Sequence, residues 1–283
     1  MTADPVAIVN ADGSELTVQL YAADKPRAVC IVFPAMGVYA KYYQPLAVEL
    51  AKNGLTTVTA DLRGNDASSI RPRRGTDFSY TDLIHLDMHS VITEIRSRYE
   101  KVPLYLFGHS LGGQLSCLYA SKHPQAVDGL ILSATCSVYH KGWEGFGAYR
   151  ILAGTQFANA VAATVGYFPG KKVGFGGTEA RSVIADWSRQ SRTGKYVLKN
   201  DDFNYENALR NLQKPVLAIS YEGDSLSPKG AVEHLLGKME SAPKQHLHLL
   251  KTDERNDELN HFNWAKKPNS VVRIVSDWVA EQS

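Results

Sequence analysis

The chain has 283 residues, of which 44% are hydrophobic and 21% are charged, as in an ordinary globular protein with a substantial core. Its 31 basic and 29 acidic residues are scattered along the sequence and leave a net charge of +2. This balance provides no electrostatic footprint for nucleic acid or for an acidic membrane. No apolar stretch approaches the roughly 20 residues that a membrane span needs. We therefore expect neither nucleic acid nor a membrane among the partners.

The three cysteines, Cys30, Cys117 and Cys136, are odd in number, widely spaced and set among apolar neighbours. They show neither a disulfide framework nor the spacing of a metal site, which favours a reducing compartment. The first residues also lack the basic segment and apolar run of a signal peptide. We expect a cytoplasmic protein that uses no metal or organic cofactor.

Strand and helix patterns alternate along most of the chain. Apolar and β-branched runs predict strands over 16–21, 29–33, 55–62, 104–107 and 129–134. Helical spacing of apolar residues predicts helices over 43–52, 82–99 and 111–122. The same alternation resumes with a strand over 215–220, a helix over 228–239, a strand over 246–250 and a helix over 269–281. Strands separated by such helices predict an α/β fold with a mostly parallel sheet covered on both faces.

The stretch 136–212 contains no buried-strand run and is rich in glycine, aromatic residues and helical pieces. We interpret it as a cap inserted between two parts of one core, 1–135 and 213–283. Its aromatic side chains either line a substrate pocket or attach the cap to the core. If they line a pocket, the expected pocket residues are Trp143, Tyr149 and Trp187.

A candidate nucleophile lies between the strand 104–107 and the helix that begins at Leu111. Gly108-His-Ser-Leu-Gly112 fits the pattern G-x-S-x-G. In that context the serine occupies a sharp strand-to-helix turn with a strained backbone, above the carboxyl edge of the sheet. Ser110 is therefore the expected nucleophile.

A serine hydroxyl needs a base, and the base needs a carboxylate that orients it. Asp224 lies in the loop that follows the strand 215–220, and His261 lies in the loop after the last strand. Both loops reach the sheet edge where Ser110 is expected, so the sequence predicts a triad of these residues. The weaker alternatives are Glu222 as the acid and His109, His246 or His248 as the base.

Together these motifs resemble those of the α/β-hydrolase superfamily. They are GHSLGG over 108–113, EGDSLSP over 222–228 and NHFNW over 260–264. The likeness runs from residue 16 to the final helix, and the chain is similar to serine-aminopeptidase-like and esterase-like hydrolases with a short cap. The resemblance implies a twisted, mostly parallel sheet flanked by helices, with a helical cap.

The resemblance also implies two backbone donors for the oxyanion of acyl transfer. One is the amide of Leu111, directly after the nucleophile. The other, by position, is the amide of Met36, although Pro34 and Ala35 replace the usual His-Gly of that loop. The turn 61–64, Asp-Leu-Arg-Gly, resembles a recurring turn of the family and is expected to have a structural role.

These residues predict a serine hydrolase that cleaves an ester, thioester, lactone or amide bond of a small acyl substrate. An acyltransferase with the same triad and an acceptor other than water is the alternative. A binding protein that kept the triad without catalysis is a second alternative, which the complete set of three residues disfavours. A dehalogenase is disfavoured because Ser110 occupies the position where that reaction needs aspartate. The oligomeric state is not predicted.

Overall fold

The computed structural model describes residues 2–252 and 258–282. Within them, eight strands form one sheet in the order β1-β2-β4-β3-β5-β6-β9-β10. β1 and β2 are antiparallel to their neighbours, and the pairs from β4 to β10 are parallel. The strands are β1 (Asp4–Val9), β2 (Glu15–Tyr21), β3 (Ala28–Phe33), β4 (Leu55–Ala60), β5 (Leu104–His109), β6 (Gly129–Ser133), β9 (Val216–Tyr221) and β10 (Lys244–Leu249). The chain has the α/β-hydrolase fold predicted from its sequence.

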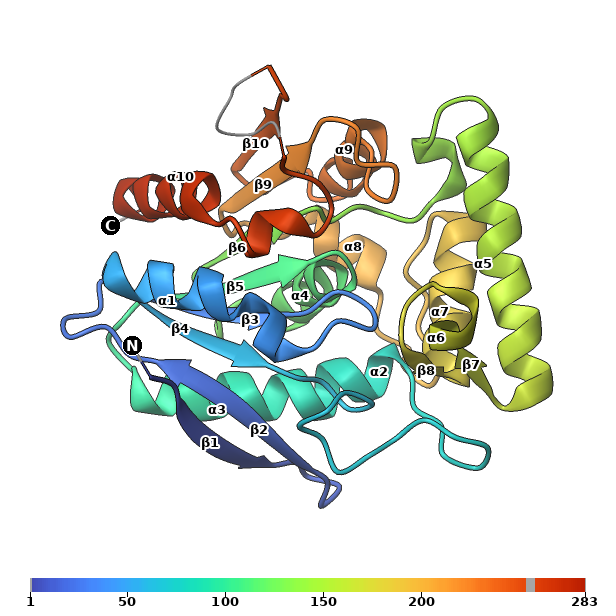
Figure 1. Cartoon of the computed structure of the whole chain (residues 1–283), viewed down its shortest axis with the longest axis horizontal. Coiled ribbons are helices and arrows are strands. Elements are labelled where there is room, and N and C mark those ends of the chain that lie inside the picture. The colour runs from blue at the N-terminus through green and yellow to red at the C-terminus, as the bar shows by residue number, and fades with distance from the viewer. Residues whose placement is uncertain (1, 253–257, 283) are drawn as a thin grey trace.

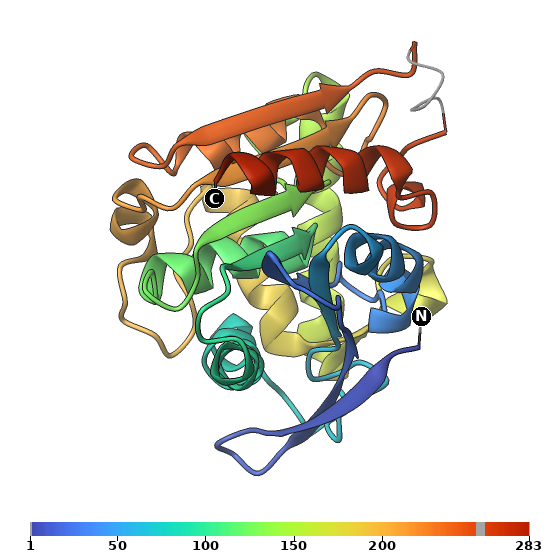
Figure 2. The same cartoon turned by 90° about the vertical axis from the view of Figure 1, so that its left-hand side faces the viewer.

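Helices cover both faces of the sheet, as continuous apolar strands require (Figure 2). In β3, Val29 and Ile31 face one apolar core and Cys30 and Val32 face the other. The first core contains residues of α3 and α4, and the second contains residues of α1 and α10. The helices of the core are α1 (Gln44–Lys52), α2 (Tyr80–Asp82), α3 (His89–Arg98), α4 (Leu111–Lys122), α9 (Lys229–Gly237) and α10 (Asn269–Glu281).

Two elements differ from the prediction. β1 was not predicted, because alternate side chains of this edge strand are exposed and its register with β2 leaves only one face buried. The long helix predicted over 82–99 is divided into α2, a π-helical stretch over Leu83–Met88 and α3. The π-helical stretch could not be predicted, because the spacing of apolar residues does not reveal which hydrogen bonds a helix forms. π-helical turns are also rare.

Residues 136–212, here called the cap segment, lie between β6 and β9. They form α5 (Phe146–Val165), α6 (Gly170–Val173), α7 (Arg181–Thr193), α8 (Tyr205–Arg210) and a small antiparallel pair, β7 (Tyr167–Pro169) and β8 (Thr178–Ala180). Figure 1 shows α5, α6 and α7 beside the end of the molecule toward which β4 and β5 point. α8 instead packs against α4 of the core.

The turn over 61–64 is fixed by two separate sets of contacts. Asp61 accepts the backbone N–H of Ala40 at 2.7 Å. Arg63 pairs with the fully buried carboxylate of Asp87 and with Asp12, whose Oδ2 lies 3.0 Å from the guanidinium. Asp61 and Arg63 thus hold the turn through different partners, in line with its expected structural role.

Candidate active site

Ser110 occupies the turn between β5 and α4 with a φ of 51° and a ψ of −114°. A non-glycine residue pays a conformational cost in this region, and such strain is concentrated at functional sites. Close packing of the surrounding chain holds this strained turn in place. A Cβ atom at Gly112 would lie 2.2 Å from the carbonyl oxygen of Phe33. Glycine at this position therefore lets α4 begin directly against the end of β3.

Asp224 and His261 form a buried pair. Nδ1 of His261 lies 2.8 Å from Oδ2 of Asp224, and both side chains are less than one-tenth exposed. Oδ1 of Asp224 accepts the backbone N–H groups of Leu226 and Ser227 at 2.9 and 3.0 Å. The alternative acid, Glu222, is exposed and accepts the backbone N–H of Lys251 instead.

The loop that carries His261 is anchored by Trp264. This side chain is fully buried and stacks on Phe107 of β5 and on Tyr221 of β9, with ring centroids 5.7 and 6.4 Å apart. Its indole N–H donates to the carbonyl oxygen of His261 at 2.9 Å. An aromatic residue three positions after the histidine thereby sets where the imidazole lies. The sequence contains this signal within NHFNW, but the role was not predicted.

His109, the residue before Ser110, has a supporting position. Burial lowers the pKa of His109 well below its ordinary value, so the ring is neutral. Burial also raises the pKa of Tyr43, so its hydroxyl remains protonated. That hydroxyl lies 2.7 Å from Nδ1 of His109 and accepts the backbone N–H of Ala35 at 3.0 Å. His109 thus helps to hold the loop that precedes Met36. The other alternative bases, His246 and His248, lie on β10 and both contact the hydroxyl of Ser220.

Ser110 and His261 line one cavity of about 180 Å³, together with residues of the core and of the cap segment. Within the described chain, no hydrogen bond joins Oγ of Ser110 to the histidine ring, although the sequence predicts that contact. Catalytic hydrogen bonds are often long in free enzymes and shorten when substrate binds. The other lining residues are Ala35, Met36, Leu111, Gln114, Cys136, Val138, Ile151, Gly174, Phe175, Gly176, Trp187, Leu226 and Phe262.

The amides of Leu111 and Met36 are both available to a ligand. Leu111 is the first residue of α4, where backbone N–H groups have no partner within the helix. No hydrogen bond between described residues uses either amide. Both residues line the cavity with Ser110, so this geometry agrees with the pair of donors that the family resemblance implies.

The loop of Met36 packs directly against the cap segment. A Cβ atom at Gly37 would lie 2.1 Å from the backbone nitrogen of Gly177 and 2.4 Å from the carbonyl carbon of Gly176. Lys171 of α6 adds a second contact, since its ammonium group lies 2.5 Å from the hydroxyl of Tyr39. The glycine-rich stretch 174–177, which looks like a flexible loop in the sequence, therefore forms both a wall of the cavity and a support for the loop of Met36.

A larger, mostly apolar hollow of about 570 Å³ adjoins the cavity and shares Ile151, Phe175, Trp187 and Leu226 with it. Trp187 lines both spaces, whereas Trp143 lines only the adjoining hollow. The prediction for Tyr149 is wrong. Its side chain is 71% exposed and lines neither space, because it lies on the outward face of α5.

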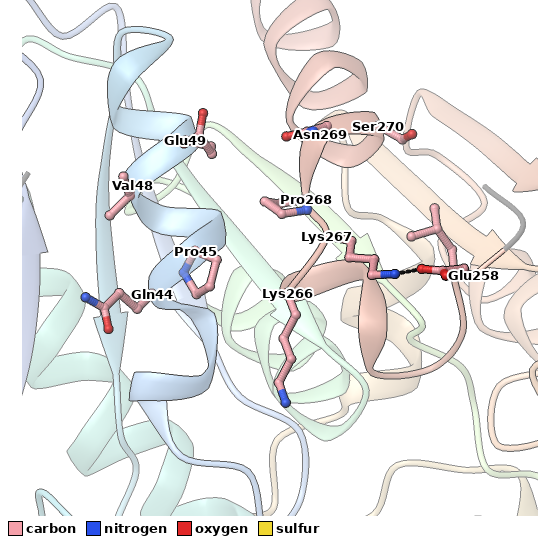
Figure 3. A pocket seen from close by; sticks show the side chains of 11 residues that line it. Gln44, Pro45, Val48, Glu49, Glu258, Lys266, Lys267, Pro268, Asn269 and Ser270 are labelled. Carbon is pink, nitrogen blue, oxygen red and sulfur yellow. Dashed lines mark ion pairs between the residues drawn. The ribbon is translucent and has the colours of Figure 1, made fainter. Parts of the chain in front are cut away.

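Another hollow, of about 760 Å³, lies away from Ser110 between α1 and the start of α10 (Figure 3). Its lining mixes polar and apolar surface, and Lys267 and Glu258, which line it, form an ion pair. Across the described ranges, no group of three or more His, Cys, Asp or Glu side chains could hold a metal ion. Over the same ranges, every helix is too short or too polar to span a bilayer.

Comparison with known families identifies the chain. The family described as "serine aminopeptidase, S33" matches residues 24–252, most of the sequence and both Ser110 and Asp224. The chain belongs to the serine aminopeptidase S33 family. It is therefore a serine hydrolase with an α/β-hydrolase fold.

Relatives of this family member include monoglyceride lipases. The monoglyceride lipase of Rattus norvegicus is 26% identical over 284 residues, which cover 97% of this chain and 90% of the lipase. The solved structure of a monoglyceride lipase from Saccharomyces cerevisiae matches with a TM-score of 0.72 at 19% identity, covering 100% and 97% of the two chains. A thermophilic esterase from Thermogutta terrifontis matches with a TM-score of 0.65 at 15% identity, covering 99% of each chain.

Proposed function

We propose that this serine hydrolase cleaves carboxylic esters that carry an apolar group, through an acyl-enzyme formed on Ser110. The observation that carries the proposal is the cavity itself. Its lining includes a strained serine, a carboxylate-bound histidine and two residues with unpaired amides, and it adjoins a mostly apolar hollow.

In the first half of the reaction, His261 accepts the proton of the Ser110 hydroxyl through Nε2 while Oγ bonds to the ester carbonyl carbon. The oxyanion that forms accepts hydrogen bonds from the amides of Leu111 and Met36. Asp224 holds Nδ1–H of the imidazole and stabilises the positive charge of the ring. The carbon–oxygen bond to the alcohol then breaks, and the alcohol leaves with the proton from His261.

In the second half, water takes the place of the alcohol. His261 removes one proton from the water as its oxygen attacks the acyl carbon. Collapse of the second tetrahedral intermediate breaks the bond to Oγ, and the proton returns to Ser110. The carboxylic acid is released and the enzyme is restored.

The adjoining hollow supports an apolar group on the substrate. Its walls include Phe157, Phe168, Phe175 and Trp187, and its volume of about 570 Å³ can hold an alkyl or aryl group. Burial of each methylene contributes roughly 0.8 kcal/mol to binding, which favours longer chains until the hollow is full. The monoglyceride lipases among the relatives are consistent with an ester substrate of this kind.

The proposal is tested with p-nitrophenyl esters of two to twelve acyl carbons and with a serine-directed fluorophosphonate. We expect hydrolysis whose kcat/KM rises with chain length, and labelling that Ser110→Ala abolishes without a change in the circular dichroism spectrum. Labelling that persists in Ser110→Ala, or a wild-type protein that hydrolyses none of the esters, would overturn the proposal.

We also propose that the protein resides in the cytoplasm. Its three cysteines are free and buried, so the described fold uses no disulfide. Fractionation of cells that express the protein with its native termini tests this location, and recovery outside the cytoplasm would contradict it.

A further inference from the structure

Gln114 introduces a neutral amide into the wall of the catalytic cavity. It lies on α4, four residues after Ser110, and its side chain is only 2% exposed. Its backbone N–H donates to the carbonyl oxygen of Ser110 at 3.2 Å, and both residues line the same cavity. Most of the cavity wall around Gln114 is apolar. The amide is therefore buried next to the nucleophile without belonging to the triad.

Tyr196 fixes the orientation of this amide. Its side chain is also 2% exposed, and burial raises the pKa of its hydroxyl well above the ordinary value. The hydroxyl is therefore a donor, and it donates to Oε1 of Gln114 at 3.2 Å. Among the described residues, this oxygen is the only acceptor that the hydroxyl has. A flipped amide would leave the phenolic proton without a partner, so Oε1 must face Tyr196.

The amide nitrogen of Gln114 is then the group available to the cavity. Tyr196 does not line the cavity, whereas Gln114 does. Among the hydrogen bonds between residues 2–252 and 258–282, the side chain of Gln114 takes part through Oε1 and none uses Nε2. A donor left unpaired in a buried site weakens any complex in which it stays unpaired. A ligand that supplies an acceptor therefore binds more tightly than a ligand of the same shape that does not.

The charge of the cavity wall limits the kind of acceptor. None of its lining residues is a lysine or an arginine. A buried carboxylate would have no cation to compensate it, whereas a neutral oxygen needs only the amide donor.

We propose that Gln114 is a specificity-determining residue that selects esters carrying a neutral oxygen acceptor, such as a hydroxyl, ether or ketone oxygen, within a few bonds of the scissile carbonyl. This inference rests on the proposed ester hydrolysis and adds the polar feature of its substrate. The oxygen can belong to the acyl chain or to the alcohol, and the two sources are separated by experiment.

The test compares two matched pairs of esters. In the acyl pair, p-nitrophenyl hexanoate is set against p-nitrophenyl 4-oxahexanoate. In the alcohol pair, propyl hexanoate is set against 2,3-dihydroxypropyl hexanoate. For each pair, the ratio of kcat/KM for the oxygen-bearing ester to that of the plain ester is measured. Comparing variants with wild type through this ratio cancels the intrinsic reactivity of each ester.

We expect Gln114→Leu to lower the ratio about 10- to 100-fold in at least one pair, because the side chain loses its donor at similar size. Gln114→Met provides the same test if the leucine variant folds poorly. Tyr196→Phe should lower the same ratio less, about 3- to 10-fold, because the amide keeps its donor but loses its fixed orientation. The exposed Gln213 supplies the control, and Gln213→Leu should leave both ratios unchanged.

The outcomes separate this inference from the proposed function. A lower ratio in one pair supports the inference and identifies the acyl or the alcohol part as the source of the oxygen. Ratios that stay within twofold of wild type in both pairs, for Gln114→Leu and Gln114→Met, overturn the inference alone. A wild-type protein that hydrolyses none of the four esters overturns the proposed function and this inference with it.

Discussion

The substitution Asp224→Asn exchanges one carboxylate oxygen for an amide nitrogen and keeps the shape of the side chain. In the wild-type protein, Oδ1 accepts the backbone N–H groups of Leu226 and Ser227, and Oδ2 faces Nδ1 of His261 at 2.8 Å. An amide nitrogen cannot accept those two backbone hydrogen bonds. The asparagine must therefore keep its oxygen at the Oδ1 position and turn its NH₂ group toward His261.

This orientation forces the histidine into the wrong tautomer. Nδ1 must accept from the NH₂ group, so the ring proton moves to Nε2, which can then no longer accept the proton of Ser110. We expect kcat to fall by a factor on the order of 10⁴. A change of that size corresponds to about 5 kcal/mol of lost transition-state stabilisation.

The assay measures kcat and KM for p-nitrophenyl hexanoate, together with the thermal unfolding midpoint. Glu222→Gln is the matched control. Its wild-type carboxylate accepts the N–H of Lys251, and we expect activity within twofold of wild type. A loss of less than tenfold in Asp224→Asn, or of more than 100-fold in Glu222→Gln, would show that the acid has been misassigned.

Three further predictions concern the pocket, the core and pH. Trp187→Ala should change the chain-length preference among p-nitrophenyl esters at least tenfold. Tyr149→Ala, at an exposed position of α5, should leave that preference unchanged. Equal effects of the two substitutions would contradict the pocket described here. Asp87→Ala should lower the free energy of unfolding in urea by about 3 kcal/mol, because it leaves the guanidinium of Arg63 buried beside an empty site. The control Asp66→Ala removes an exposed ion pair with Lys41 and should have little effect. A loss below 1 kcal/mol for Asp87→Ala would refute that reasoning. Because burial lowers the pKa of His109 below its ordinary value of 6.5, the unfolded chain binds a proton there that the folded chain does not. Stability should therefore fall as the pH drops below about 6.5, and His109→Gln should reduce the slope by up to about 1.4 kcal/mol per pH unit; an unchanged slope would contradict this.

Much of the core could be predicted because its strands are buried on both faces. Runs such as 29–33 and 104–107 are continuously apolar, and the helices between them have clear apolar spacing. The edge strand β1 lacks that signal, since it begins Asp4-Pro5 and alternate side chains are exposed. The π-helical stretch over Leu83–Met88 shares the composition of an ordinary helix, so its different hydrogen bonding was not visible in the sequence.

The three predicted triad residues could be placed because each one follows a strand in the sequence, and parallel strands end at the same edge of the sheet. Ser110, Asp224 and His261 follow strand ends, and the parallel arrangement brings those ends together. Tyr149 was misplaced because α5 is apolar around much of its circumference, so its sequence does not indicate which face turns inward. Gln114 was overlooked, although its place in the first turn of the helix that follows Ser110 is itself a signal.

The backbone contact between Gly37 and the stretch 174–177 ties the cap segment to the loop that carries Met36. Any residue with a side chain at Gly37 would collide with Gly176 and Gly177, and Phe175 of the same stretch lines the cavity. A chimaera that receives the cap of another hydrolase would therefore change the support of the Met36 amide along with the shape of the pocket. Exchanging caps to alter substrate range should succeed only where the donor cap has glycine at the two positions that contact Gly37.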